Sequence, residues 1–241
     1  VQLVKNKSDS KIKKLRKTYS SLFNFLGKCL KMMILFSPLG WVGIYLVEGI
    51  KSIVSALRRK PISPPVQSRI FEVVGPYEMR ERREEISELP ERCVLLRIML
   101  TGICHADLRY VSCSRPPHIL RERLPLPVFH EGIARIVEVG DEVQNFRQGD
   151  LVVIVPNVPC YIQDPERYPD IYRACESCRP GGPGENLCRD VKFLSSNAPG
   201  LSRTFVIHPA SCVFHVPEGS PEEIAVLTEP LTVIKRAIEL A

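Results

Sequence analysis

The chain has 241 residues, of which 44% are hydrophobic and 25% charged, proportions that exclude wholesale disorder. Its 21 prolines favour turns and edge strands over a helical bundle. The net charge of +6 is uneven, because residues 1–60 hold 13 Lys/Arg against two acids whereas residues 61–241 hold 20 against 25. The larger part has no basic footprint for nucleic acid, which we exclude as a partner.

Residues 1–60 form a basic and apolar segment. The run Met32–Val47 has 16 uncharged residues, but it contains Pro38, Gly40 and Gly43. It is shorter than the roughly 18–20 apolar residues that a spanning helix needs. We expect a helical extension that contacts a membrane surface through its charge and its apolar run. The alternative is a helical extension that packs on a protein partner or a second subunit.

After this segment the pattern changes to short strands. Residues 61–66 are Pro-rich and predict a stiff linker to a domain over residues 67–228. Turn signals at Gly140-Asp141 and Gly149-Asp150 separate β-branched and aliphatic runs, a pattern typical of an all-β barrel or sandwich. The predicted strands are Ile70–Val74, Val94–Leu100, Ile133–Val139, Leu151–Val155, Thr204–Ile207 and Val213–Val216.

Only two stretches look helical. Pro221–Leu227 opens with Ser220 as the expected cap and Pro221 as the first helical residue. Leu231–Leu240 follows, so that residues 229–241 would begin a helix leading out of the domain.

The candidate chemistry begins with Cys104, which is followed 26 residues later by the pair His130-Glu131. A thiolate, an imidazole and a carboxylate make the mixed ligand set of a zinc ion that keeps a coordination position open. Singly, each residue has an ordinary interpretation, as a buried cysteine, a core or surface histidine and a solvated acid. Nine cysteines, a Cys-x-x-Cys and no signal-peptide pattern indicate metal ligation in a reducing compartment, here the cytoplasm.

Five motifs in order resemble the zinc-dependent medium-chain alcohol dehydrogenase family. They are Gly102-Ile-Cys-His-Ala-Asp-Leu, Phe129-His-Glu-Gly-Ile-Ala-Arg-Ile-Val-Glu-Val-Gly, Phe146-Arg-Gln-Gly-Asp-Leu-Val, Gly184-Glu-Asn-Leu-Cys and Leu227-Thr-Glu-Pro-Leu-Thr-Val. The resemblance covers about residues 67–241, and its Glu-Pro-Leu ending is similar to the polyol, sugar and threonine dehydrogenase branch. It implies a mainly β, GroES-like β-barrel catalytic domain.

The resemblance also implies a catalytic zinc. Cys104 and His130 would be its protein ligands, Glu131 a ligand or a close carboxylate, and Glu229 a ligand directly or through water. Zinc would lower the pKa of a substrate alcohol so that hydride can leave. Many relatives carry Ser or Thr where this chain has Ala106, so the proton must leave by water, by Glu131 or by another group. We interpret His105, Asp107 and Asp150 as structural or peripheral residues.

A second cluster consists of Cys175, Cys178 and Cys188. In the family a lobe with four cysteines holds a structural zinc. Here Tyr172 stands where the first cysteine is expected, and Cys160 is the replacement. Four thiolates would close the site and stabilise a loop with little core of its own. A redox Cys-x-x-Cys is the alternative, but it needs a helix N-terminus that this Pro/Gly-rich lobe does not supply.

The family binds NAD or NADP in a separate doubly wound domain, and no Gly-x-Gly-x-x-Gly fingerprint occurs here. We therefore expect the zinc-binding part of an alcohol, polyol or sugar dehydrogenase, inactive as a fragment and a homo-oligomer at full length. The alternative is a non-catalytic, zinc-stabilised GroES-like domain tethered to a membrane or a protein partner by residues 1–60.

Overall fold

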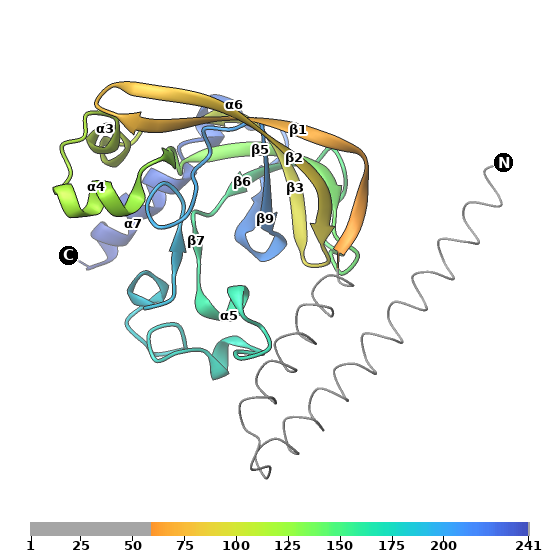
Figure 1. Cartoon of the computed structure of the whole chain (residues 1–241). Coiled ribbons are helices and arrows are strands. Elements are labelled where there is room, and N and C mark those ends of the chain that lie inside the picture. Colours follow the sequence, from red (N-terminus) through yellow and green to blue (C-terminus); the bar gives the residue numbers. More distant parts are fainter. Residues whose placement is uncertain (1–58, 241) are drawn as a thin grey trace, which may run out of the picture. The chain divides into compact units, whose positions relative to one another are not determined.

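The computed structural model describes residues 59–240, and the chain divides into two compact units, Val1–Lys60 and Pro61–Ala241. The helical extension expected over residues 1–60, with its membrane contact, lies outside the described residues except for its last two positions. The described part is mainly β with a few short helices, as expected (Figure 1). Its strands are β1 Arg59–Gly75, β2 Glu78–Pro90, β3 Cys93–Thr101, β4 Leu126–Pro127, β5 Gly132–Val139, β6 Leu151–Ile154, β7 Asn157–Val158, β8 Lys192–Phe193, β9 Phe205–Pro209 and β10 Val213–His215.

The strands form three sheets, with the orders β2-β1-β4, β10-β6-β5-β3-β9 and β7-β8. Every pairing in the five-stranded sheet is antiparallel. A bridge between Ile70 and Arg203 joins β1 to the residues that precede β9. Hydrogen bonds from the Phe71 N–H to the Ser202 carbonyl and from the Thr204 N–H to the Arg69 carbonyl flank this bridge and add to the link between the two larger sheets. Among the described residues the strand ladders do not close into the complete barrel that we expected.

Strand β3 pairs with β5 and β9 and is buried on both faces over Val94–Leu96. Val94 and Leu96 contribute to the main core with Ile136, Val152 and Ile154. Leu95 points to the opposite face, into a second cluster with Ile62, Ile86 and Leu89. A strand covered on both sides reads as a continuous apolar run, which explains why Val94–Leu96 does not alternate with polar residues.

The long β1–β2 hairpin differs most from the sequence-based expectation. Residues 61–66 are not a linker, because they belong to β1. Their prolines are tolerated there since β4 pairs with β1 only at Glu72 and Val73, which leaves one side of this stretch without a ladder partner in the described chain. Strand β2 was not predicted, because its exposed charged residues hide the alternation and only Ile86 and Leu89 are buried.

The helices are α3 His105–Val111, α4 Pro117–Arg123, α5 Cys160–Gln163, α6 Glu222–Ala225 and α7 Thr228–Leu240, with 3₁₀ turns η1 Ile171–Arg173, η2 Glu185–Leu187 and η3 Ala210–Cys212. The prediction of only two helical stretches was therefore wrong. The cap was also wrong, because Pro221 itself is the N-cap of α6 and makes no side-chain cap bond. Helices α3 and α4 have seven residues each, too few for a clear 3.6-residue period.

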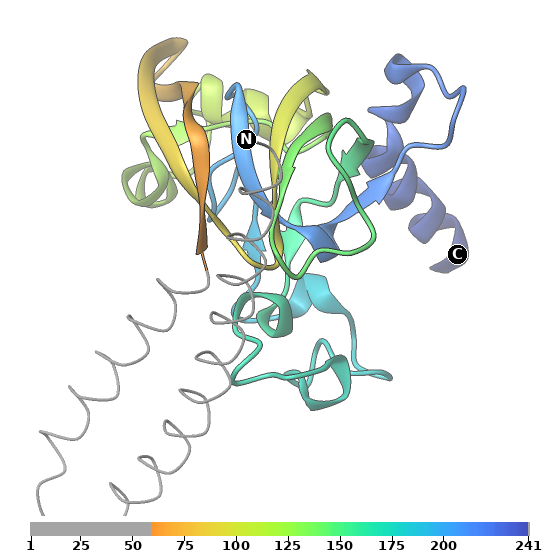
Figure 2. The same cartoon turned by 90° about the vertical axis from the view of Figure 1, so that its right-hand side faces the viewer.

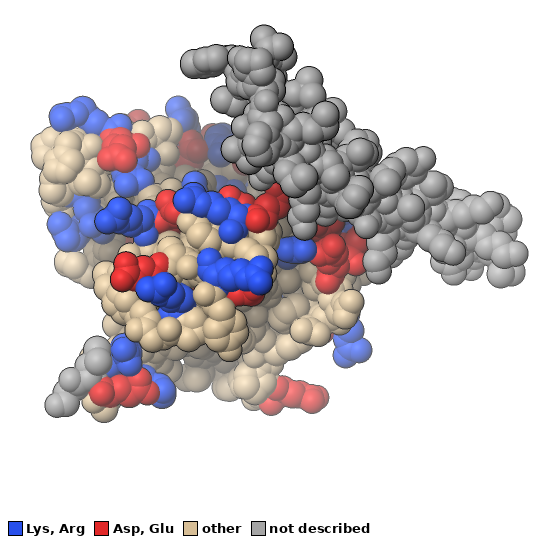
Figure 3. Space-filling model, turned by 90° about the horizontal axis from the view of Figure 1, so that it is seen from below, with Lys and Arg blue, Asp and Glu red and all other residues tan. Residues whose placement is uncertain are grey.

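The connection between β7 and β8, which includes α5, η1 and η2, projects from the sheets as a lobe, whereas α7 lies at another side (Figure 2). Within residues 59–240 each helix is too short or too polar to cross a bilayer. On the face seen from below, Lys/Arg and Asp/Glu side chains are interspersed rather than separated by sign (Figure 3).

Candidate metal centre

The pairing of β3 with β5 brings together the two halves of the first candidate site. Thr101 at the end of β3 is paired with Gly132 at the start of β5. Cys104 follows Thr101 by three residues, and His130-Glu131 immediately precede Gly132. The ligand atoms of Cys104, His130 and Glu131 consequently lie within 4.8 Å of one another. We call this group the Cys104 cluster.

Cys104 is the N-cap of helix α3. Its sulfur accepts the backbone N–H of Ala106 at 3.5 Å, and its own N–H donates to Oδ2 of Asp107 at 3.1 Å. Burial raises the pKa of the Cys104 thiol, and the carboxylates of Glu131, Asp107 and Glu229 raise it further. A divalent cation would reverse this balance by stabilising the thiolate, which is the form that binds metals.

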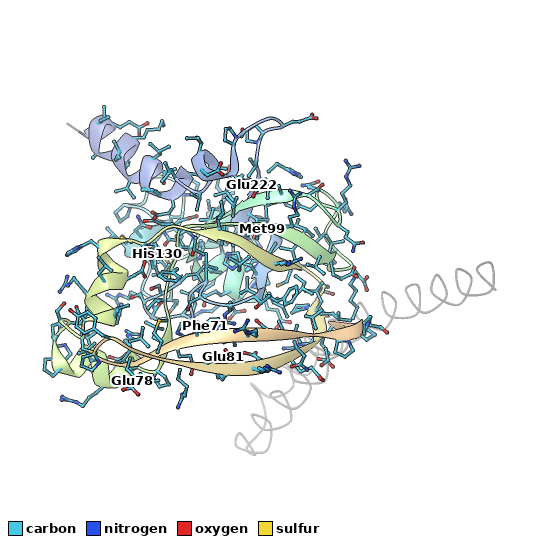
Figure 4. The ribbon with its side chains drawn as sticks, turned by 90° about the horizontal axis from the view of Figure 1, so that it is seen from above. Phe71, Glu78, Glu81, Met99, His130 and Glu222 are labelled. Atoms are coloured by element: carbon cyan, nitrogen blue, oxygen red, sulfur yellow. The ribbon has the colours of Figure 1, made fainter. Side chains whose placement is uncertain are left out.

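His130 is buried, with 5% of its surface exposed, and lies among interior side chains (Figure 4). Its Nδ1 faces Oδ1 of Asp107 at 3.5 Å, a long separation that leaves Nδ1 without a normal hydrogen bond among the described residues. With Nδ1 turned to Asp107, Nε2 is the nitrogen that can bind an ion. An imidazole that offers one nitrogen to a metal and the other to a carboxylate is the usual arrangement of a histidine ligand.

Asp107 was interpreted as structural or peripheral, and the structure places it at the centre of the polar network. It is completely buried, and its Oδ1 accepts hydrogen bonds from the Ser195 hydroxyl at 2.5 Å and the Phe129 N–H at 3.1 Å. Burial opposes ionisation, but the contacts with His130 and Ser195 prevail and lower the pKa of Asp107. The sequence carried one signal, an acid three residues after a helix N-cap.

Glu229, in the first turn of α7, is not part of the Cys104 cluster. Glu229 nevertheless interacts electrostatically with the charged groups of the Cys104 cluster. Burial raises the pKa of Glu229, the carboxylates of Glu131 and Asp107 act in the same direction, and His130 opposes them. The structure thus brings together three of the four residues expected at this site. The fourth, Glu229, lies outside the group but interacts electrostatically with it.

The four cysteines of the lobe form a second group, the cysteine site. The sulfurs of Cys160, Cys175, Cys178 and Cys188 lie within 4.8 Å of one another, and all four are free thiols. Two of the S···S distances are 3.9 Å (Cys160–Cys178) and 3.7 Å (Cys175–Cys188). A tetrahedral zinc with Zn–S bonds of about 2.3 Å has S···S edges of about 3.8 Å, so this spacing fits the ion.

The lobe has little other core. Its apolar cluster consists of three buried cysteines with Tyr161, Tyr168, Ala174 and Val191 around them. Burial raises the pKa of Cys160 and Cys178. Burial also acts to raise the pKa of Cys175, but the N–H and thiol donors around it prevail and lower it to about 7. The structure brings Cys160 into the group, and Tyr172, which stands in place of the usual first cysteine, is 78% exposed.

A pocket of about 770 Å³ lies elsewhere, between the residues before β6 and the end of β10. Phe146, Asp150 and His215 line it, and no residue of either cluster does. The His215 ring contacts the Phe146 ring at 4.6 Å between centroids and its Nε2 faces the Asn145 carbonyl at 3.1 Å. These contacts give His215 a structural role in this loop.

Residues 90–218 match a family model described as the alcohol dehydrogenase GroES-like domain. A sorbitol dehydrogenase from Bombyx mori is 29% identical over 168 residues, which cover 69% of this chain and 44% of that protein. A sorbitol dehydrogenase from Bacillus subtilis (strain 168) is 34% identical over 143 residues, 58% of this chain and 36% of that protein. A protein described as a short chain alcohol dehydrogenase from E. coli CFT073, solved with NADH, has a similar fold, with a TM-score of 0.56, 24% identity and coverage of 69% of this chain and 43% of that chain. The chain spans about two fifths of the length of these relatives.

Proposed function

Because this chain belongs to the zinc-type medium-chain alcohol dehydrogenase family, in its polyol branch, we propose that residues 67–228 are the zinc-binding catalytic part of an NAD(P)-dependent dehydrogenase. The observation that carries the proposal is the convergence of Cys104, His130 and Glu131. A thiolate, an imidazole and a carboxylate supply three protein ligands and leave a fourth position for substrate or water. The cysteine site, with four sulfurs, would be closed and structural.

Zinc bound at the Cys104 cluster would supply Lewis-acid activation of an alcohol oxygen. The chain's own residues have separate tasks. Cys104 and His130 would hold the ion, and Asp107, which faces Nδ1, would orient the His130 ring. Ala106 has no hydroxyl to pass on the substrate proton, so we assign its removal to Glu131, within the Cys104 cluster, with Glu229, which interacts electrostatically with that cluster, as the second candidate. Burial, which raises the pKa of Glu229, makes that carboxylate a better proton acceptor.

NAD or NADP would bind to a doubly wound domain outside residues 67–228. Helices α6 and α7 support this assignment, because they expose large apolar side chains. Leu231, Ile234 and Ile238 of α7 are 52%, 55% and 73% exposed. Such a face is normally covered by another part of a protein. The substrate would be a polyol, a sugar or a related secondary alcohol, as the names of the two sorbitol dehydrogenases suggest.

Metal analysis of the purified chain tests the proposal. We expect about two zinc ions per chain, one at each cluster. Cys104→Ala should remove one of them and leave the thermal stability of the lobe unchanged, because the two sites share no ligand. A Cys104→Ala chain that retains as much zinc as the unaltered chain would refute the catalytic site. Cys113→Ala, at a cysteine outside both groups, is the matched control.

One observation favours a second function, a zinc-stabilised domain without catalysis. Ala106 replaces the hydroxyl residue that many relatives use, and its N–H faces the Cys104 sulfur. The two functions differ in what the parent reading frame encodes after Ala241. A glycine-rich nucleotide-binding domain there would favour the dehydrogenase, and its absence would favour the tethered domain.

For residues 1–60 we propose contact with an anionic membrane surface, on the basis of 13 basic residues against two acids and the uncharged run Met32–Val47. The test is cosedimentation of the full chain with vesicles that contain phosphatidylserine, at low and high salt. Binding should weaken with salt and be lost when residues 1–58 are deleted. Failure to bind at low salt would overturn the assignment and favour a protein partner.

A further inference from the structure

The turn after β8 holds a serine in a backbone conformation that serine rarely adopts. Ser195 has a φ of 61° and is buried, with 4% of its surface exposed. A non-glycine residue in this left-handed region costs roughly 1–2 kcal/mol. The conformation persists because neighbouring bonds impose it: the N–H groups of Ser196 and Ala198 donate to the Phe193 carbonyl. The Asn197 side chain accepts the Phe193 N–H and donates to the Val191 carbonyl, which ties the end of the turn to the residues before it.

The strained conformation directs the Ser195 hydroxyl to Asp107. The O–H donates to Oδ1 at 2.5 Å, within the range of a charge-assisted bond between a hydroxyl and a carboxylate. The same oxygen accepts the Phe129 N–H and is the one that faces Nδ1 of His130. The other oxygen, Oδ2, accepts the Cys104 N–H. Three segments of the chain therefore determine where this carboxylate lies.

Ser195 is the only one of these three donors that is a side chain, so it is the one that a substitution can remove. Phe193 lies two residues earlier in the same segment. The centroid of its ring is 5.3 Å from the centroid of the His130 ring, with an angle of 59° between the two planes. The segment thus packs against the imidazole through Phe193 and bonds, through Ser195, the carboxylate that faces Nδ1. Both contacts limit the rotation of the ring, and with it the direction of Nε2.

We propose that Ser195 is a positioning residue for the Cys104 cluster, which acts through Asp107 to hold the His130 ring in the orientation that binds the ion. This inference rests on the proposed function. It adds a residue that lies 65 positions from His130 in the sequence and has no motif of its own. Outer groups that orient a metal-binding histidine commonly change metal affinity by about 10- to 100-fold.

Two substitutions separate the hydroxyl from the backbone strain. Ser195→Ala removes the hydroxyl and keeps the strained φ, whereas Ser195→Gly removes the hydroxyl and relieves it. Ser196→Ala is the matched control, because within residues 59–240 Ser196 bonds through its backbone N–H and not through its hydroxyl. Each variant of the 241-residue chain is titrated with Co²⁺ in competition with a chelator. The spectrum of the same variant carrying Cys104→Ala is subtracted, which isolates the Cys104 cluster from the cysteine site.

We expect Ser195→Ala and Ser195→Gly each to weaken Co²⁺ binding at the Cys104 cluster by about tenfold. We also expect both to shift its absorption bands, while the cysteine site and Ser196→Ala are unchanged. A shift in only one of the two variants, or unaltered affinity and bands in both, would overturn the role of the hydroxyl. If the unaltered chain shows no Cys104-dependent band, the proposed function fails and the inference fails with it. If the Cys104-dependent band is present but is the same in the Ser195 variants, the inference fails and the proposed function stands.

Discussion

Gly102 and Glu131 lie in contact because Gly102 has no side chain. The Gly102 N–H donates to the Glu131 carbonyl at 2.9 Å, which joins the two backbones just beyond the β3–β5 ladder. A Cβ atom on Gly102 would overlap Oε2 of Glu131 and lie 3.1 Å from its Cβ. The carboxylate occupies the space that an ordinary residue at position 102 would fill.

Gly102→Ala should therefore displace the Glu131 carboxylate and leave the fold intact. The atom in the way is the far end of a flexible side chain, so the acid can turn aside at little cost. We expect the melting temperature of the metal-free chain to change little and Co²⁺ affinity at the Cys104 cluster to fall by about tenfold. The control is Gly102→Ala combined with Glu131→Ala. If Gly102 acts through Glu131, Gly102→Ala should cause little further loss of Co²⁺ affinity in a chain that already carries Glu131→Ala.

Cys160→Ser should release the lobe without unfolding the sheets. The lobe's apolar cluster depends on its buried cysteines, whereas the main core between the strands contains none of them. We expect loss of one zinc per chain and rapid proteolysis between residues 161 and 190, with the strand signal in circular dichroism retained. Cys113→Ser, outside both groups, should leave the lobe resistant to proteolysis. Equal resistance of both variants would contradict a structural metal in the lobe.

His208 should make the domain less stable in mild acid. It is buried on β9, with 3% of its surface exposed, and its Nε2 faces the Val155 carbonyl at 3.0 Å. Burial lowers its pKa from 6.5 to about 4. Because the folded-state pKa is depressed, the unfolded chain binds a proton that the folded chain does not between these values. Stability present above pH 6.5 is then lost as the pH falls toward 4, by about 2 kcal/mol between pH 7 and pH 5.

The measurement is urea unfolding at pH 7 and pH 5 for the unaltered chain and for His208→Gln. Glutamine retains an N–H donor for Val155 but does not titrate. The difference between the two proteins isolates His208, because both carry the same two clusters. An identical pH dependence in both would show that His208 is not held neutral by burial.

Glu72 should be the one acid of the β1–β2 hairpin whose loss is easily measured. Its carboxylate is 6% exposed and accepts hydrogen bonds from Arg82 at 2.6 Å and Arg80 at 3.0 Å. The two arginines are 40% and 57% exposed and can be rehydrated when the acid is removed. We therefore expect Glu72→Gln to lower the free energy of unfolding by about 1–2 kcal/mol, less than breaking a fully buried pair.

Glu84→Gln is the control for this prediction. Glu84 is 45% exposed and pairs with Arg82 at 3.1 Å, so its loss should cost no more than about 0.5 kcal/mol. Denaturant unfolding of both variants provides the comparison. Equal effects would mean that burial of the Glu72 carboxylate does not strengthen its bonds.

Much of the domain could be predicted from the chain alone. Aliphatic runs such as Val94–Leu100 and Ile133–Val139 correctly marked strands, because β-branched and aliphatic side chains fit the pleated, half-buried surface of a sheet. The motifs around Cys104 and His130 correctly indicated the family, which the matched family model confirms. Strand β2 and helices α3 and α4 escaped prediction, since an exposed charged edge and seven-residue helices carry little periodic signal.

The amino-acid sequence by itself determined which atoms are available: the soft and hard ligands, the four lobe sulfurs and the apolar runs that drive the strands together. Only the tertiary structure decided how they are arranged. It placed Asp107 and Ser195 behind His130, left Glu229 outside the group of three, and assigned the Pro-rich residues 61–66 to a strand. The physical reason is that a side chain's chemistry is a property of the residue itself. Distances between residues far apart in the chain depend instead on strand pairing and on which polar groups become buried together.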